Sequence, residues 1–142
     1  MERAIDLSRF VTAHEQSCRT ALGEIRNGRK VSHWMWYIFP QLRGLGNSQI
    51  SRYYAVRGLD EAAAFLKDPY LGKNLREISG ALLELETDDP EAVFGFTDSV
   101  KLRSSMTLFS LAPGADPVFG SVLEKYFGGE GDDRTRALLG LS

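Results

Sequence analysis

The sequence contains very little cysteine and histidine. Its single cysteine is Cys18, and its two histidines are His14 and His33. One cysteine cannot form an internal disulfide, which is typical of proteins in a reducing compartment, so we expect a cytoplasmic location. One cysteine and two histidines also give no metal-ligand spacing, and we expect no metal.

Long hydrophobic runs are absent as well. The longest, residues 34–39, is far too short to cross a bilayer, and the first ten residues lack the apolar stretch of a secretory signal. We therefore expect no membrane partner. The 142 residues are 43% hydrophobic and 25% charged, an ordinary globular composition, and they suffice for one domain over residues 1–142.

Acidic residues are missing between Glu24 and Asp60. Six cations lie in that interval. Because the net charge of the whole chain is −2, the residues outside the interval together carry a charge of −8. A positive block attracts anions, although many such blocks are solvated surface paired with acidic neighbours. Because the aromatic segment 34–39 lies in the same interval, we favour a ligand site. The six cations are Arg26, Arg29, Lys30, Arg43, Arg52 and Arg57.

The common phosphate-loop, dinucleotide, hydrolase and zinc-protease motifs are also missing. The stretch "RGLGNS" (43–48) shares only two glycines with a dinucleotide-binding loop. The sequence therefore assigns no reaction, and we expect no cofactor.

Aspartates that can cap a helix recur along the chain. Three of them precede proline, which combines an N-cap carboxylate with a preset φ at the first helical position. Apolar residues recur at steps of three and four in these segments, as in amphipathic helices. The pattern predicts an all-α, compact multihelical single domain of about six helices, with one short extended segment for which "YYAV" (53–56) is a candidate. The Asp-Pro pairs are at 68–69, 89–90 and 116–117, and the other predicted caps are Asp6, Asp60 and Asp132 or Asp133.

The first predicted helix carries an apolar stripe that ends before Asn27-Gly28. His14 lies on this stripe. We predict that His14 is buried and hydrogen-bonded to a backbone carbonyl, rather than functional.

The aromatic segment 34–39 admits two readings. Its composition suits a strand, whereas Ser32 as an N-cap and Pro40 as a stop suit a helix of two turns. Such a helix would be apolar on nearly every side and would have to be buried. We expect at least two of Trp34, Trp36 and Phe39 to be core residues. Tryptophan and histidine N–H groups need partners when buried, so this element should also contact polar groups.

Two segments combine groups that could carry chemistry. In 33–48, polar groups stand among aromatics, and glycines allow close approach of the backbone. In a predicted helix over 98–109, a lysine faces several hydroxyls. We predict that a pocket between them binds a small anionic molecule, such as a nucleotide or phosphorylated metabolite, with or without turnover. The predicted ligand-binding residues are His33, Trp36, Gln41, Arg43, Gly44, Gly46, Ser48, Lys101, Arg103 and Ser104.

Three of these side chains are candidates for catalysis. His33 can carry a proton, and a lysine one turn from a serine, as Lys101 is from Ser105, is one route to an activated nucleophile. No third group orients a base, and helical serines commonly bond backbone carbonyls. The alternative is an ordinary polar helix face.

The same segments carry a family resemblance. "SHWMWYIFPQLRGLGNSQIS", "DPYLG" and "DSVKLRSSMTLF" resemble an uncharacterised bacterial family, the domain of unknown function eighteen-ten, over roughly Phe10 to Leu139. The resemblance implies a compact multihelical domain and no established activity. Some members are labelled calpastatin, a disordered inhibitor, and the capped helices here argue against that label. The family's signature residues correspond to His33, Trp34, Trp36, Phe39, Pro40, Gln41, Gly44, Gly46, Ser48, Asp98, Lys101, Ser104, Ser105 and Thr107.

Two other functions compete with a ligand site. A protein-interaction module without catalytic activity would use exposed aromatics of 34–39 as anchors for a protein partner. Nucleic-acid binding through the basic interval is disfavoured, because the net charge is negative and no helix-turn-helix or zinc pattern is present.

Overall fold

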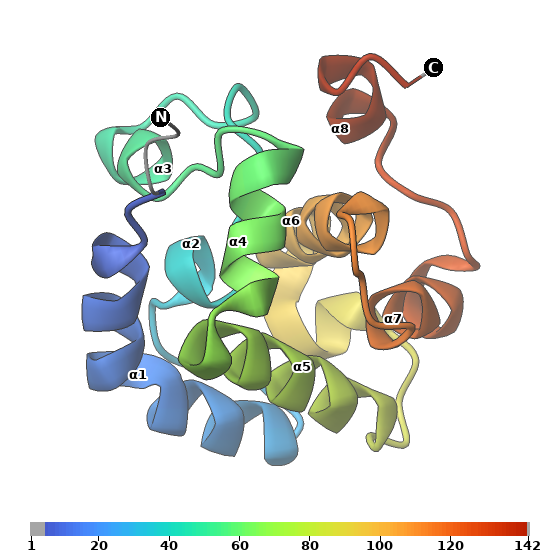
Figure 1. The fold of residues 1–142 in the computed structure, drawn as a ribbon. Helices are drawn as coiled ribbons and strands as arrows, with labels where there is room; N and C mark the ends of the chain where they lie inside the picture. Colours follow the sequence, from blue (N-terminus) through green and yellow to red (C-terminus); the bar gives the residue numbers. More distant parts are fainter. Residues whose placement is uncertain (1–4, 142) are drawn as a thin grey trace.

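The computed structural model describes residues 5–141, which form eight helices (Figure 1). They are α1 (Ser8–Arg26), α2 (Met35–Ile38), α3 (Gln49–Tyr53), α4 (Leu59–Lys67), α5 (Pro69–Leu83), α6 (Pro90–Leu111), α7 (Val118–Phe127) and α8 (Asp133–Leu138). Helix α5 packs against α1, α4 and α7, and α6 packs against α4, α7 and α8. The five long helices all contribute apolar side chains to one buried cluster. The predicted all-α, compact fold is confirmed.

The extended segment is a single parallel bridge between Leu42 and Val56. The Val56 N–H donates to the Gln41 carbonyl at 2.9 Å, and the Arg43 N–H donates to the Val56 carbonyl at 2.7 Å. The bridge joins the two ends of the loop that contains α3. Val56 belongs to the predicted stretch 53–56, whereas Tyr53 is already the last residue of α3.

Three of the predicted aspartate caps are present, at Asp68, Asp89 and Asp132. Asp68 accepts hydrogen bonds from the Tyr70 and Leu71 N–H groups, so α5 begins at Pro69 as expected. The side chains at 89 and 132 cap α6 and α8 in the same way.

Asp6 and Asp116 are not caps, contrary to the sequence prediction, because α1 and α7 begin one residue later, with Leu7 and Pro117 in the cap positions. Their carboxylates accept instead from the N–H groups of Ser8 and Val118, the first residues of these helices.

Asp60 is not a cap, contrary to the sequence prediction. Helix α4 begins one residue earlier, at Leu59, with Gly58 in the cap position and Asp60 in the first turn. The physical reason for this earlier start is the side chain of Glu61. The Glu61 carboxylate accepts a hydrogen bond from the Arg57 N–H at 3.3 Å, which holds the chain before the helix in place of an aspartate cap.

His14 of α1 is buried as predicted, and its ring contacts two other helices. Its Nε2 lies 2.7 Å from the Tyr37 carbonyl oxygen, and its Nδ1 lies 3.1 Å from Nδ2 of Asn74. Because a carbonyl oxygen only accepts, Nε2 carries the proton and Nδ1 accepts from the amide. Burial lowers the pKa of His14, and it outweighs the hydrogen bond to the Tyr37 carbonyl. The histidine therefore joins α1, α2 and α5 as a neutral side chain.

The aromatic segment forms one helical turn, α2, rather than two turns or a strand. Ser32 does not cap it, because its hydroxyl donates instead to Glu24 Oε2 at 2.6 Å. Trp34 and Phe39 are each 1% exposed, which confirms that at least two of the three large aromatics are core residues. Trp36 is only partly buried, so it is the member of the three that can face a ligand.

Candidate functional site

The two segments predicted to form a site do meet, at Trp36 of α2 and Lys101 of α6. The Lys101 ammonium lies 5.2 Å from the centre of the Trp36 ring. Asp98 pairs with Lys101 at 3.5 Å and with Lys30 at 2.9 Å, and Lys30 lies 5.0 Å from the centre of the Trp34 ring. Both ammonium groups are thus already engaged by a carboxylate and an aromatic face.

The hydroxyls of α6 serve mainly the helix itself. Ser104 donates to the Val100 carbonyl at 3.2 Å, and Thr107 donates to the Arg103 carbonyl at 2.8 Å. Ser105 is completely buried, and its hydroxyl has no hydrogen-bond partner among the described residues. These contacts match the alternative reading of this segment, in which the hydroxyls bond to the backbone.

The other predicted ligand-binding residues are spread over the surface. His33, Arg43, Gly44 and Ser48 are exposed, and Ser48 caps α3 by accepting from the Ser51 N–H at 3.2 Å. Arg103 is engaged elsewhere, since it pairs with Glu130 at 3.5 Å.

A hollow does lie within the predicted segment, but it is very small. It measures about 10 Å³ and is lined by Trp36, Gln41, Gly46 and four neighbours from 42–55. That volume admits about one water molecule. A nucleotide therefore does not fit there.

Glu24 is a polar centre that the sequence analysis missed. Its Oε1 accepts from the indole N–H of Trp34 at 2.9 Å and from the N–H groups of Val31 and Ser32 at 2.7 and 2.9 Å. Burial of this carboxylate tends to raise its pKa, but the hydrogen bonds from Ser32, Val31 and Trp34 together outweigh burial and lower the pKa of Glu24 to about 2. The need of a buried tryptophan for an acceptor was the available signal, and Glu24 is that acceptor.

A large cavity is lined by residues from the N-terminal end of α1, from α3, from the start of α4 and from α8. Its volume is about 1100 Å³, which is ample for a metabolite. Residues far apart in the sequence line it. They are Ile5, Asp6, Ser8, Arg9, Arg52, Tyr53, Arg57, Gly58, Leu59, Asp60, Glu61, Leu138 and Leu139.

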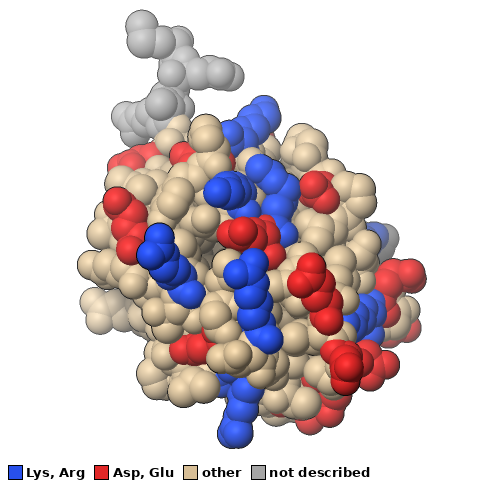
Figure 2. Space-filling view, turned by 90° about the horizontal axis from the view of Figure 1, so that it is seen from below, with Lys and Arg blue, Asp and Glu red and all other residues tan. Residues whose placement is uncertain are grey.

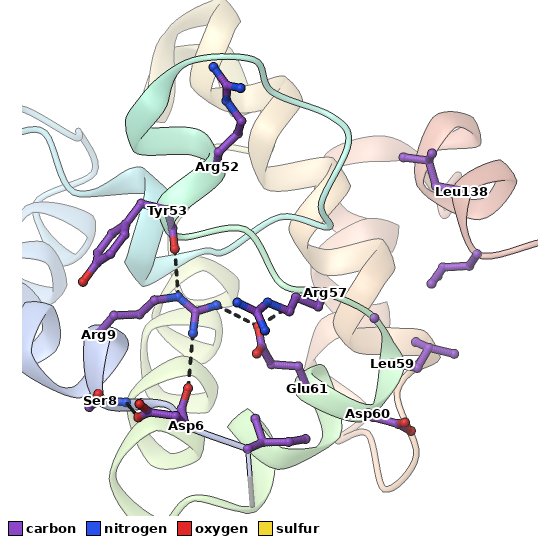
Figure 3. A pocket seen from close by; sticks show the side chains of 13 residues that line it. Asp6, Ser8, Arg9, Arg52, Tyr53, Arg57, Leu59, Asp60, Glu61 and Leu138 are labelled. Carbon is purple, nitrogen blue, oxygen red and sulfur yellow. Dashed lines mark hydrogen bonds and ion pairs between the residues drawn. The ribbon is translucent and has the colours of Figure 1, made fainter. Parts of the chain in front are cut away.

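Arg9 lies at the centre of this cavity wall and is held from several sides (Figure 3). It pairs with Glu61 at 2.8 Å and donates to the carbonyls of Tyr53 and Ala55 at 2.8 and 2.9 Å. The two charged side chains of the pair are 15% and 8% exposed. A pair this well buried and hydrogen-bonded fixes the α3–α4 segment against α1, so Arg9 is a structural clamp with little capacity left for a ligand.

Two other arginines of the cavity are differently placed. Arg57 lies beside the Arg9–Glu61 pair in Figure 3, and Arg52 lies on α3 at the far side of the wall. Both residues are exposed, and neither guanidinium forms an ion pair or hydrogen bond with another residue of 5–141. The acid-free interval noted in the sequence thus supplies two available cations to this cavity.

Neither Arg52 nor Arg57 is among the site residues predicted from the sequence. One predicted residue does lie next to the cavity: a Cβ built on Gly44 would be 3.4 Å from the Leu138 side chain that lines it. Residues 5–141 hold no group of three His, Cys, Asp or Glu side chains close enough to bind a metal ion. Nor does this range include a helix long and apolar enough to span a membrane.

Comparison with known proteins identifies the family. The model of the family described as "Protein of unknown function (DUF1810)" matches residues 4–139. The chain belongs to this family. The family resemblance drawn from the aromatic and "KLRSSMTLF" segments is therefore confirmed. The match to the DUF1810 family covers nearly the whole chain.

A solved structure supports the fold of this DUF1810 chain. The chain is similar to the crystal structure of the conserved hypothetical protein Rv1873 from Mycobacterium tuberculosis, with 45% sequence identity and a TM-score of 0.92. The alignment covers 96% of this chain and 98% of that one. Among curated proteins, none matches the sequence.

Proposed function

We propose that this protein binds a small anionic molecule in the cavity between α1, the α3–α4 segment and α8. The observation that carries the proposal is Arg57, an exposed arginine in a cavity of about 1100 Å³ whose guanidinium has no partner among residues 5–141. Beside it, the Arg9–Glu61 pair contributes no net charge. The whole lining is neutral, because Arg9, Arg52 and Arg57 balance Asp6, Asp60 and Glu61, so the attraction for an anion is local to the unpaired guanidinium groups.

Guanidinium groups suit phosphate and carboxylate groups, because their planar donors match two acceptor oxygens. Arg52 adds a second such group on the same cavity. The ligand class is the one expected from the charge pattern of the sequence, a nucleotide or another phosphorylated metabolite. Its place differs from the pocket predicted between 33–48 and 98–109, where the hollow of about 10 Å³ gives no room for it.

A thermal-shift screen tests this function. Inorganic phosphate, phosphate monoesters, nucleotides and acidic metabolites would be added to the purified chain at low salt. A ligand at one hundred times its dissociation constant stabilises the fold by about 2.7 kcal/mol, which raises the melting temperature of a domain of this size by roughly 5–10 °C. We expect such a hit to disappear in Arg57→Ala and to weaken in Arg52→Ala.

Arg43→Ala is the matched control, since Arg43 is also exposed and belongs to the earlier predicted pocket. It should keep the response. A hit that survives Arg57→Ala but disappears in Arg43→Ala or Lys101→Ala would move the site back to the 33–48 and 98–109 segments and contradict the proposal.

The competing functions have less support from the described surface. The interaction-module reading needs exposed aromatics, but of segment 34–39 only Trp36 and Tyr37 are partly accessible. On the face shown in Figure 2, basic and acidic side chains are interspersed, which does not suit a nucleic-acid backbone on that face.

The place of action that we propose is the bacterial cytoplasm. The free thiol of Cys18 supports this location, because a protein with a free cysteine and no disulfide among its described residues is typical of a reducing compartment. Fractionation of cells that express the protein from its own promoter, followed by immunoblotting, tests the location.

A further inference from the structure

Part of the cavity lining is apolar. Three of the large apolar side chains most exposed in this chain line the cavity: Ile5 at 41%, Tyr53 at 59% and Leu138 at 51%. Leu59 and Leu139 lie beside them and are partly buried. Exposed apolar groups gathered in one concave site mark a place where a ligand or partner covers them.

We infer that the ligand of this site is an anion carried on an apolar group of about the size of an aromatic ring. The inference rests on the proposed anion site and specifies the rest of its ligand. The anionic group would lie at Arg57, and the apolar group would lie against Leu59 of α4 and Leu138 of α8, which are on the same side of Arg57 in Figure 3. A purely polar anion such as free phosphate would leave this apolar wall in water.

The apolar wall from α8 is held firmly in place. The segment before α8 is bonded to α6: the Asp132 N–H donates to the Thr107 hydroxyl at 2.8 Å, and Arg103 Nε donates to the Glu130 carbonyl at 3.1 Å. Gly131 lies so close to Thr107 that a Cβ there would be 3.2 Å from its side chain. These contacts position α8 so that Leu138 faces the cavity (Figure 3).

The wall beside Arg57 also limits the anion to one group. Asp60 and Asp6 line the cavity, and a second anionic group placed near their carboxylates would be repelled. The arrangement therefore suits a monoanionic or monoester head with an uncharged body, rather than a molecule with charges at both ends.

A matched pair of probes tests the inference. Methyl phosphate and phenyl phosphate carry the same anionic group and differ in the apolar part. By calorimetric titration we expect phenyl phosphate to bind at least about tenfold more tightly, because burying a ring against Leu138 and Leu59 removes apolar surface from water. Leu138→Asn should reduce that ratio to about threefold or less while methyl phosphate affinity stays the same.

Leu141→Asn is the control, because Leu141 is a partly exposed leucine just beyond α8 that does not line the cavity. It should keep the full ratio. Equal affinities for the two probes, both lost in Arg57→Ala, would overturn the apolar inference and leave the anion site standing. Binding of neither probe, or binding that Arg57→Ala does not change, would overturn the anion site and the inference together.

Discussion

The indole N–H of Trp34 donates to Glu24 Oε1 at 2.9 Å, and this bond ties the aromatic segment to the end of α1. The same carboxylate accepts from the backbone N–H groups of Val31 and Ser32. One side chain thereby satisfies four donors in the connection between α1 and α2, including the Ser32 hydroxyl. The buried tryptophan and the turn that delivers it depend on Glu24.

Replacing Glu24 should destabilise the fold and change its acid response. In Glu24→Gln, the amide nitrogen would face donors that now bond to an oxygen, and we expect a loss of about 2 kcal/mol, as for a charge-assisted hydrogen bond. Urea unfolding at pH 7 measures this loss. Glu15→Gln, at an exposed position on the same helix, should leave the unfolding midpoint unchanged.

The pH dependence follows from the lowered pKa of Glu24. A carboxyl group whose folded pKa is depressed stabilises the fold above its unfolded pKa, near 4.5, and loses that contribution as the pH falls toward about 2. Melting temperatures between pH 5 and pH 2.5 should therefore fall more steeply in the wild type than in Glu24→Gln. Parallel curves would contradict the assigned role.

Buried His14 should act in a different pH range. Burial lowers its pKa below the ordinary 6.5, so the unfolded chain takes up a proton that the folded chain resists. The contribution to stability is complete above pH 6.5 and decreases as the pH falls below it. His14→Gln, which can still donate to the Tyr37 carbonyl, should flatten the decline of melting temperature between pH 7.5 and 5.5. The exposed His33→Gln variant should retain the wild-type slope, and a change there instead would refute the assignment to His14.

The buried hydroxyl of Ser105 is unsatisfied, since it has no hydrogen-bond partner among the described residues. Removing an unsatisfied buried group relieves its desolvation cost, so Ser105→Ala should keep or raise the stability by about 1 kcal/mol. Thr107→Val also removes a hydroxyl, but it leaves the Asp132 N–H without its acceptor. It should lower the stability by about 1–2 kcal/mol. Chemical denaturation of the two variants side by side measures both effects, and a loss in Ser105→Ala would indicate a partner that the static structure does not show.

The comparison of sequence and structure separates local from non-local features. Asp68 and His14 could be predicted, because a cap acts within one helical turn and an apolar stripe follows from helical spacing. The cavity could not, since Arg9, Arg57 and Leu138 line one cavity only because α1 and α4 both pack on α5, and α4 and α8 both pack on α6. Glu24 escaped prediction for a related reason: its position before the acid-free interval marks a boundary, but only the fold shows that it turns back to Trp34.

Two glycines of α5 should respond in opposite ways to the same substitution. A Cβ on Gly72 would lie 2.1 Å from the carbonyl oxygen of Leu66, which is backbone of the preceding helix and cannot move aside as a side chain would. Gly72→Ala should therefore push α4 and α5 apart and cost about 1–3 kcal/mol, as overpacking does. Gly80 lies in the same helix with open space where its Cβ would be. Gly80→Ala should raise the stability by roughly 0.5–1 kcal/mol, because alanine favours the helical conformation. Thermal unfolding of both variants measures the contrast. Equal effects of the two substitutions would show that the close contact between Gly72 and the Leu66 carbonyl does not control the corner between α4 and α5.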